Sequence, residues 1–354
     1  MRVTEELKSL GERIRAAATQ RRALRIRGGG SKDFYGGTPH GQLCETTALR
    51  GIVDYEPTEL VITARAGTDL REINATLREQ GQMLGFEPPS FTDQATLGGA
   101  VASGLSGPRR PYCGAVRDFV LGVQIIDGRG DLLRFGGRVI KNVAGFDVAR
   151  LMAGSMGTLG LLTEITLKTT PCPTAECTLR FEFDEAQALD TMSRWVGRPL
   201  PISGTAWHAG QLSVRLSGAP AALQAARRAL GGETLERAGE YWQAVREHQL
   251  AFFTTAESLW RISLPGHAPP LALGEVFLEW GGALRWLHGP ADADEMRARA
   301  SRFAGHATLF RSAARPAGGP FQPQTPALLA LQQRLKAVFD PYRLFNPGRL
   351  YPEL

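Results

Sequence analysis

The sequence predicts an α+β protein in three parts: a glycine-loop domain at 1–172, a smaller α+β domain at 173–315, and a C-terminal linker, helix and tail at 316–354. Three observations carry this prediction. Strand and helix patterns alternate along the chain. Glycine loops bound the strands of the first half and become sparse after residue 175. The stretch 315–326 is rich in proline and glycine, which is typical of a linker.

The first domain opens with a helical pattern at 4–20, where apolar residues recur at the spacing of one helix face. A second helix is predicted at 69–80, with Thr68 or Asp69 as its cap and Gly81 at its end. Strands are predicted at 23–27, 51–55, 60–66 and 83–86. Strand–helix–strand order with short links indicates a small α/β layer.

A second layer, mainly antiparallel, is predicted from residue 88 to residue 170. Two of its strands, 119–126 and 131–136, flank Asp127-Gly-Arg-Gly, which is a hairpin signal, and a third covers 160–168. In the next domain, strands at 178–183 and 211–216 alternate with helices at 185–195 and 219–230. A last helix is predicted at 326–339.

Three glycine-containing segments offer backbone N–H groups that no side chain shields. They are Arg27-Gly-Gly-Gly-Ser-Lys, Thr96-Leu-Gly-Gly and Gly157-Thr-Leu-Gly. Turns of this kind form concave nests of backbone donors, which bind pyrophosphate groups. Three such loops suit an extended, phosphorylated cofactor better than a small substrate.

Composition narrows the class of protein. The apolar fraction of 43% and the charged fraction of 21% are those of an ordinary globular protein. No apolar run is long enough to span a bilayer, and the charged N-terminus lacks the apolar core of a signal peptide, so we expect a cytoplasmic protein.

The basic residues behind the net charge of +6 are interspersed with acidic residues, so nucleic acid is not an expected partner. Four dispersed cysteines predict no disulfide framework and no metal site: Cys44, Cys113, Cys172 and Cys177.

The dinucleotide fingerprint and the P-loop are both absent, so the three loops require another fold. Four motifs resemble the FAD-binding domain of the vanillyl-alcohol oxidase/p-cresol methylhydroxylase (PCMH) superfamily: Arg27-Gly-Gly-Gly-Ser, 95–104, Tyr112-Cys-Gly-Ala-Val-Arg-Asp and 154–160. Segment 339–349, which contains Asn346-Pro-Gly-Arg, is similar to the tail that returns to the flavin domain in the lactate and glycolate branch. Segments 138–155 and 259–265 resemble the E subunit of bacterial glycolate dehydrogenase, a resemblance that spans nearly the whole chain.

The resemblance implies FAD as the cofactor, bound non-covalently because the first glycine loop holds no histidine or cysteine. The residues that it implies beside the FAD diphosphate are Arg27, Gly28, Gly29, Gly30, Ser31 and Lys32, and those implied on the opposite wall of the site are Ala95, Thr96, Gly98, Gly99, Ser103 and Gly104. The adenosine part would be held by Gly157, Thr158, Leu159 and Gly160, with further cofactor contacts from Tyr112 and Gly114. Asn346 would lie near the isoalloxazine ring. A plain turn remains the alternative for each glycine, and core packing is expected for the side chains of Leu97 and Leu159.

Catalytic candidates are few. The catalytic relatives use a histidine base and often a bound metal, but none of the six histidines here lies at metal-ligand spacing: His40, His208, His248, His267, His288 and His306. We expect each to be a surface or structural residue. The guanidinium of Arg261 can clamp a carboxylate bidentately, or its stem can pack beside Trp260. Arg285, beside Trp286, poses the same alternatives.

The resemblance implies an FAD-binding subunit of a multi-subunit glycolate (2-hydroxy acid) dehydrogenase. It would pass electrons from hydroxy-acid oxidation through flavin to an iron–sulfur partner, since this chain lacks the cysteines for a cluster. The implied partners are a larger flavin-binding subunit and an iron–sulfur subunit, through which alone the chain would contact the inner face of the membrane. Two alternatives stay open. One is a self-sufficient FAD-dependent hydroxy acid or alcohol oxidoreductase, and the other is a non-catalytic assembly subunit that keeps the fold.

Overall fold

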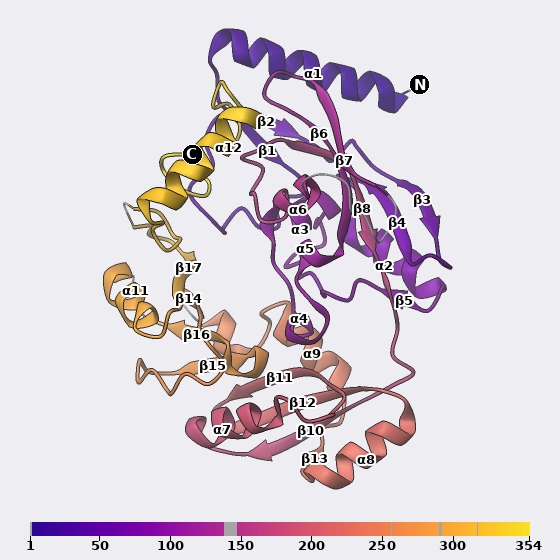
Figure 1. Cartoon of the computed structure of the whole chain (residues 1–354), viewed down its shortest axis with the longest axis vertical. Coiled ribbons are helices and arrows are strands. Elements are labelled where there is room, and N and C mark those ends of the chain that lie inside the picture. The colour runs from indigo at the N-terminus through magenta and orange to yellow at the C-terminus, as the bar shows by residue number, and fades with distance from the viewer. Residues whose placement is uncertain (1, 138–146, 256, 290–291, 317) are drawn as a thin grey trace. The chain divides into compact units, whose positions relative to one another are not determined.

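The computed structural model describes residues 2–137, 147–255, 257–289, 292–316 and 318–354. These residues form two compact units (Figure 1). Unit 1 contains Met1–Leu105, Ala115–Pro171 and Pro323–Leu354, and unit 2 contains Ser106–Gly114 and Cys172–Gln322. Helices and sheets occur in both units, which confirms the predicted α+β class.

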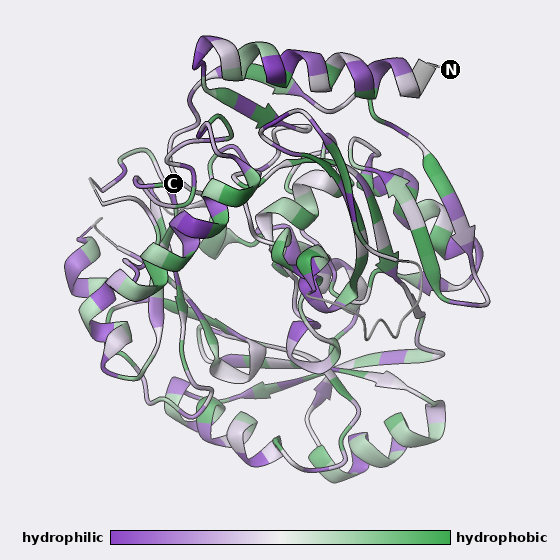
Figure 2. Cartoon of the chain, turned by 45° about the horizontal axis from the view of Figure 1, so that its top comes forward, coloured by the Kyte–Doolittle hydropathy of each residue, from purple (hydrophilic) through white to green (hydrophobic). Residues whose placement is uncertain are grey.

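A five-stranded antiparallel sheet forms the centre of unit 1. Its strand order is β3 (Ile52–Glu56), β4 (Val61–Arg65), β8 (Leu161–Lys168), β6 (Val120–Ile126) and β7 (Leu132–Gly136). The three inner strands are buried along nearly their whole length. Their buried positions include polar side chains that bond to one another, such as the hydroxyls of Thr63 and Thr166, which are 2.9 Å apart. The strands of this sheet are largely green in Figure 2.

The predicted boundary between two layers near residue 88 is wrong. Strands β3 and β4 belong to the same sheet as β6, β7 and β8, since Val61 pairs with Lys168 and Arg65 pairs with Glu164. This pairing joins segments about a hundred residues apart, and local periodicity carries no signal for such a contact. The predicted hairpin at 127–130 is confirmed, with Ile126 opposite Leu132.

A separate parallel pair, β1 (Leu24–Arg27) and β2 (Gln42–Glu45), carries the first glycine loop. Phe345 of the C-terminal tail forms a parallel bridge with Leu24 on this pair. Helix α1 (Arg2–Gln20) packs Ile14 and Ala17 into a small core with these strands and the tail. The N-terminal helix and the tail therefore support the strand that leads into the loop.

The remaining elements of unit 1 are short, apart from two helices. Asp69 caps α2 (Leu70–Glu79) by accepting from the Arg71 N–H at 2.8 Å. Of the strand predicted at 83–86, only Met83 pairs with another strand, as the second residue of β5. The other elements are β5 (Gln82–Met83), α3 (Leu97–Ser103), α5 (Val116–Phe119), α6 (Val148–Leu151), β9 (Thr170–Pro171) and α12 (Pro326–Phe339).

Unit 2 is built on one eight-stranded antiparallel sheet. Its order is β13 (Glu233–Thr234), β10 (Ala175–Glu182), β12 (Gln211–Gly218), β11 (Ile202–His208), β15 (Val276–Glu279), β16 (Leu284–His288), β14 (Ser258–Ser263) and β17 (His306–Ser312). Its helical elements are α4 (Arg110–Cys113), α7 (Glu185–Trp195), α8 (Pro220–Leu230), α9 (Ala238–Arg246), α10 (Ala251–Thr254), η1 (Trp280–Gly282) and α11 (Ala293–Ser301).

Helix α7 occupies the range that the sequence predicts. A capping box fixes its start, because Asp184 Oδ1 accepts from the Gln187 N–H at 2.8 Å and Gln187 Oε1 accepts from the Asp184 N–H at 3.1 Å. The helix places Ala188, Leu189 and Met192 in a core with apolar strand residues. None of the described helices is long and apolar enough to cross a membrane.

Candidate functional site

The first glycine loop, residues 28–32, follows β1 and lines an open pocket of unit 1. Among the described residues, the amide N–H groups of Gly28, Gly29, Gly30 and Ser31 donate to no protein acceptor. Gly30 has φ +74°, in the left-handed region that favours glycine. A row of unused backbone donors in such a loop is an anion-binding nest.

Close packing also requires glycine in this loop. A Cβ atom on Gly28 would collide with Thr96 Oγ1, and one on Gly29 would collide with the carbonyl oxygen of Gln94. The loop therefore lies directly against the segment that leads into α3. Any side chain at these positions would push the nest away from that wall.

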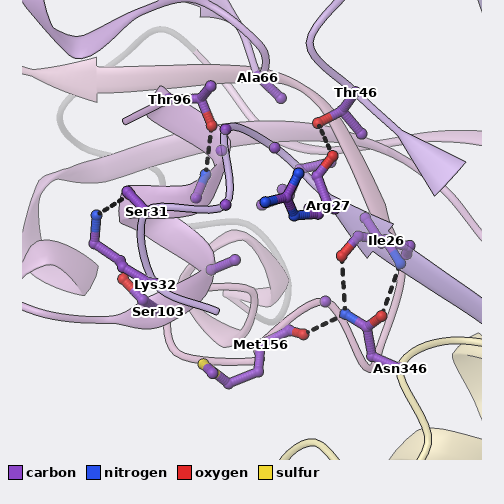
Figure 3. A pocket seen from close by; sticks show the side chains of 18 of the residues that line it. Ile26, Arg27, Ser31, Lys32, Thr46, Ala66, Thr96, Ser103, Met156 and Asn346 are labelled. Atoms are coloured by element: carbon purple, nitrogen blue, oxygen red, sulfur yellow. Dashed lines mark hydrogen bonds between the residues drawn. The ribbon is translucent and has the colours of Figure 1, made fainter. Parts of the chain in front are cut away.

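The opposite wall is α3, whose cap is Thr96 (Figure 3). Thr96 Oγ1 accepts from the Gly99 N–H at 3.2 Å, and the Gly98 N–H donates to Ala66 O at 2.7 Å. Thr96, Gly98, Gly99 and Ser103 line the pocket. Since the amides of Gly98 and Gly99 are bonded within the protein, this wall supplies a close-fitting surface more than free donors.

The third glycine loop reaches the same pocket through Gly157 and Gly160. Gly157 has φ +71°, and a Cβ atom there would lie 2.7 Å from the side-chain nitrogen of Asn346. Thr158 points into the protein instead: it is 1% exposed and its hydroxyl donates to Ser155 O at 2.7 Å. Leu159 is also buried, as its expected core packing requires.

Asn346 ties the C-terminal tail to two walls of the pocket (Figure 3). Its Oδ1 accepts from the Ile26 N–H at 2.8 Å, and its Nδ2 donates to Met156 O at 2.7 Å. The backbone has φ 43°, a conformation that asparagine tolerates better than most residues. The side-chain amide is thus occupied in positioning β1 and the third loop relative to each other.

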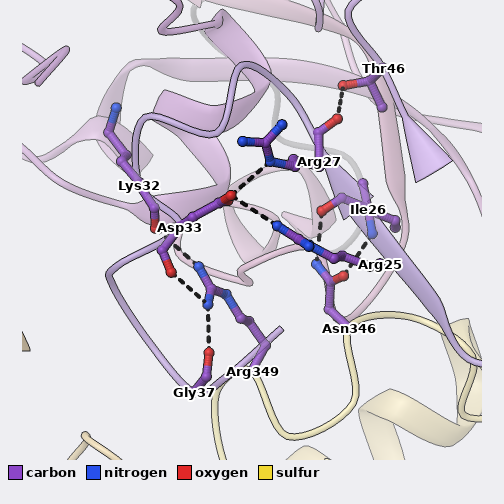
Figure 4. A network of polar contacts seen from close by, with 9 residues as sticks. All are labelled: Arg25, Ile26, Arg27, Lys32, Asp33, Gly37, Thr46, Asn346 and Arg349. Atoms are coloured by element: carbon purple, nitrogen blue, oxygen red, sulfur yellow. Dashed lines mark hydrogen bonds and ion pairs between the residues drawn. The ribbon is translucent and has the colours of Figure 1, made fainter. Parts of the chain in front are cut away.

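Basic side chains dominate the charge around the first loop (Figure 4). Asp33 Oδ2 accepts from Arg27 Nε at 2.7 Å and from Arg25 Nη2 at 2.9 Å. Arg349 donates to the carbonyl oxygens of Lys32 (3.0 Å), Asp33 and Gly37. The pocket lining contains Arg27, Lys32 and Arg349 against one carboxylate, so its charge favours an anion.

A buried ion pair connects α12 and the tail to the third glycine loop. Lys336 Nζ donates to Asp340 Oδ2 at 2.8 Å, to Thr158 O at 2.7 Å and to Phe345 O at 2.8 Å. Burial lowers the pKa of Lys336 below its usual value, and the ion pair with Asp340 opposes that shift. All three ammonium protons have acceptors, which is the condition for a tolerated buried charge.

Arg261, the catalytic candidate, lies on β14 in unit 2. Its guanidinium carbon is 5.1 Å from the ring centre of Trp280, and that of Arg110 is 4.4 Å from the same ring. Burial lowers the pKa of His306, and the charges of Arg261 and Arg110 lower it further. Two guanidinium groups on one indole create a positive region that suits a carboxylate.

The other candidates have structural environments. Arg285 is fully buried and donates to the carbonyl oxygens of Gly282, Pro269 and Ala268, so it is no substrate clamp. Burial lowers the pKa of His248 well below its usual value, and its ring stacks on Phe253. Within the described residues, no group of three or more His, Cys, Asp or Glu could hold a metal ion.

The chain is similar to known flavoproteins. Residues 4–136 match the FAD binding domain family. The chain is 48% identical to glycolate oxidase subunit GlcE of Escherichia coli over 355 aligned positions, which cover 100% of both chains. The chain belongs to the GlcE family of glycolate oxidase subunits. It is therefore an FAD-dependent oxidoreductase subunit, and the family name implies partner subunits.

More distant relatives match this GlcE-family chain only in part. Glycolate oxidase subunit GlcD of Bacillus subtilis is 32% identical over 141 residues, 40% of this chain and 30% of that protein. D-lactate dehydrogenase of Anaerostipes hadrus is 29% identical over 147 residues, 42% of this chain and 30% of that protein. The structure of alkyldihydroxyacetonephosphate synthase aligns with a TM-score of 0.69 at 14% identity, covering 96% of this chain and 75% of that one. That likeness supports the PCMH-type fold.

The structure brings most of the expected FAD residues of this GlcE-family chain to one pocket. The lining residues that were expected are Arg27, Gly28, Gly29, Gly30, Ser31, Lys32, Thr96, Gly98, Gly99, Ser103, Gly157, Gly160 and Asn346. The expected residues outside the described lining are Ala95, Gly104, Thr158 and Leu159 in unit 1, and Tyr112 and Gly114 in unit 2. Residues 138–146 of the motif at 138–155 lie outside the described residues.

Sequence reasoning missed eight lining residues: Ile26, Asp33, Thr46, Ala66, Ala102, Met156, Leu162 and Arg349. Two of them had a usable signal, because Arg349 belongs to the terminal Asn-Pro-Gly-Arg motif and Met156 directly precedes the third glycine loop. Thr46 and Ala66 reach the pocket through strand pairing and chain reversal. Nothing in their local sequence marks them.

Proposed function

We propose that this chain binds FAD in the glycine-lined pocket and serves as a flavin subunit of a multi-subunit glycolate (2-hydroxy acid) dehydrogenase. One observation carries the proposal: four successive residues of the pocket lining, Gly28–Ser31, have backbone amides that donate to no acceptor in the described part of the chain, and the charge of the lining is mainly positive. A diphosphate diester is negatively charged and rich in acceptor oxygens, so it fits this nest. Membership of the GlcE family supports the same cofactor.

Each part of the site has a role in this proposal. The first loop donates to the diphosphate, and Arg27 and Lys32 add positive charge beside it. Asn346 keeps β1 and the third loop at a fixed separation, so that both reach the same ligand. FAD bound there would supply the hydride acceptor for oxidation of the carbon that bears the hydroxyl group.

The flavin is held non-covalently in this proposal. The described residues that line the pocket include no cysteine and no histidine, the side chains that form flavin adducts most readily. Cys44 lies near β1 but is fully buried, and burial raises its pKa, which keeps the thiol protonated and unreactive. Acid precipitation should therefore release all of the yellow colour into the supernatant.

Electrons leave the chain through partner subunits. An iron–sulfur cluster needs about four clustered thiolates, and the four cysteines here are dispersed between the two units. We therefore assign the iron–sulfur centre to a partner subunit, with a larger flavin-binding subunit as the second partner. The substrate class is a small 2-hydroxy acid, in keeping with the family.

Arg261 is the residue we propose to bind the substrate carboxylate, together with Arg110 on the same indole. In the assembled complex, Arg261→Met should raise KM for glycolate by at least tenfold, and Arg261→Lys should restore part of the loss. Arg194→Met, which removes an exposed arginine of an i,i+4 pair, is the matched control. An unchanged KM in Arg261→Met would remove this assignment.

An absorbance spectrum of the purified chain tests the cofactor assignment. Flavin bands at a stoichiometry near one per chain are expected. A colourless chain that takes up no added FAD would favour the assembly-subunit alternative. Rapid reduction of the isolated chain by glycolate or lactate would favour the self-sufficient enzyme, whereas reduction only in the presence of partner subunits would support the complex.

A further inference from the structure

Helix α12 leaves a row of apolar side chains at the surface of unit 1. Leu328, Leu331 and Val338 are 48%, 44% and 61% exposed, and Leu335 between them is half-buried. We call these four residues the α12 stripe. Hydrophobic positions along this helix are green in Figure 2. Spacings of three, four and three residues place the four side chains along one line of the helix.

A different face of the helix packs against the rest of unit 1. Lys336 and Phe339 are its buried residues, and the carbonyl of Phe339 accepts from the Gly128 N–H at 2.8 Å. The α12 stripe runs beside this inner face and is not part of it. A surface helix of a globular protein normally turns its apolar face toward the core. The α12 stripe is apolar surface that the core of unit 1 leaves exposed.

The exposure is concentrated in one place. The described residues include nine large hydrophobic side chains that are strongly exposed, and Leu328, Leu331, Val338 and Tyr342 are four of them. Single exposed apolar residues are normal at a protein surface, but a cluster of this kind marks an interaction site. The stripe has the 3–4 spacing that packs against another helix or an apolar groove.

The exposed charges of α12 and of the residues just after it are positive. No aspartate or glutamate occurs between Glu295 and Asp340 in the sequence, and Asp340 is 0% exposed. Arg334, within the helix, and Arg343, just after it, are both exposed. A second copy of the chain would bring the same positive charges to its side of the contact, and repulsion would oppose that pairing.

We propose that the α12 stripe is the docking surface for a different subunit of the same oxidoreductase complex, one that presents an apolar strip flanked by carboxylates. This inference rests on the proposed function, since it requires that the chain works within a complex. Burial of the stripe would supply the affinity, and Arg334 and Arg343 would fix the register against the acidic rim.

The test is co-purification of the tagged chain with the other glycolate oxidase subunits of its own genome, co-expressed with it. Leu331→Glu combined with Val338→Glu should lower the recovery of partner subunits at least tenfold. Val196→Glu, at a residue that is 78% exposed in unit 2, is the matched control and should leave recovery unchanged. Arg334→Glu should weaken the complex at low salt, with a smaller effect at high salt.

Flavin content separates the possible outcomes. Because the substituted residues are exposed, the double variant should keep the FAD content and melting temperature of the parent chain. Unchanged partner recovery in the double variant would overturn the docking proposal. A chain that is dimeric alone and monomeric after substitution would reassign the stripe to self-association, which also overturns it. Absence of FAD from the parent chain would instead overturn the proposed function.

Discussion

The side-chain amide of Asn346 donates to the carbonyl oxygen of Met156 at 2.7 Å, across 190 residues of sequence. The same side chain accepts from the N–H of Ile26. A single residue of the tail therefore connects the strand before the first glycine loop with the loop that contains Gly157. Three distant segments of the pocket lining are therefore joined at this point.

Substitution of Asn346 should loosen the site. Asn346→Ala removes both hydrogen bonds and places alanine at φ 43°, so we expect a loss of about 2 to 4 kcal/mol in the free energy of unfolding. Asn346→Gly removes the same hydrogen bonds, but glycine tolerates the backbone conformation, so the free energy of unfolding should fall by less than in Asn346→Ala. Chemical denaturation of both variants measures the difference, and FAD titration should show weaker binding in each. Equal stability of the two variants would show that backbone conformation plays no part.

Gly29→Val should abolish FAD binding. The Cβ atom would overlap the carbonyl oxygen of Gln94, which forces the loop away from α3 and breaks the nest. Far-UV circular dichroism should remain that of the parent chain, because the displacement is local. Gly239→Val is the control, since a Cβ atom at Gly239 meets nothing within 4 Å. Normal flavin occupancy in Gly29→Val would remove the diphosphate assignment.

Gly99→Ala probes the opposite wall more gently. The new methyl group would meet only Thr96 Oγ1, at 3.2 Å, and alanine is favoured over glycine in a helix by about 1 kcal/mol. We expect a chain of equal or higher melting temperature with weaker FAD binding, because the methyl group narrows the pocket. Differential scanning fluorimetry with and without FAD measures both effects, and a large loss of stability would contradict the packing described here.

Lys336 should be among the most sensitive positions for stability. Lys336→Ala leaves Asp340 buried without its counter-ion, at a cost of about 3 to 5 kcal/mol. Lys336→Met combined with Asp340→Asn removes both charges and should be less harmful than the single change. Lys8→Ala, at an exposed i,i+4 pair, is the control and should change the free energy of unfolding by less than about 0.5 kcal/mol.

His248 should make unit 2 sensitive to acid. In the unfolded chain its imidazole takes up a proton as the pH falls through about 6.5, whereas burial keeps the folded form neutral to a lower pH. The unfolded state therefore binds more protons in this window, and the free energy of unfolding falls by up to about 1.4 kcal/mol per pH unit below 6.5. His248→Phe should flatten this dependence in denaturation curves measured from pH 7 to pH 5. The exposed His267→Gln should leave it unchanged.

Local patterns predicted the helices α1, α2, α7, α8 and α12, whereas α9 and α11 were not predicted. Asp69 and Asp184 start α2 and α7 at the positions that their side chains favour. The pairing of β4 with β8 was not predictable from such signals, since strand partners are chosen by tertiary packing. The glycine loops were recognisable because anion binding and close packing both demand glycine. Thr46 and Ala66 line the pocket because of where distant strands end, and no local motif encodes those positions.

The dependence of Ile26 on Asn346 also bears on how the protein is made. A ribosome adds about 5 to 20 residues per second, so the 320 residues between these partners take roughly 15 to 60 s to synthesise. Throughout that interval the emerging β1 lacks the segment that fixes its end. The nascent chain cannot complete its cofactor cradle early, so flavin capture becomes one of the last events of biogenesis.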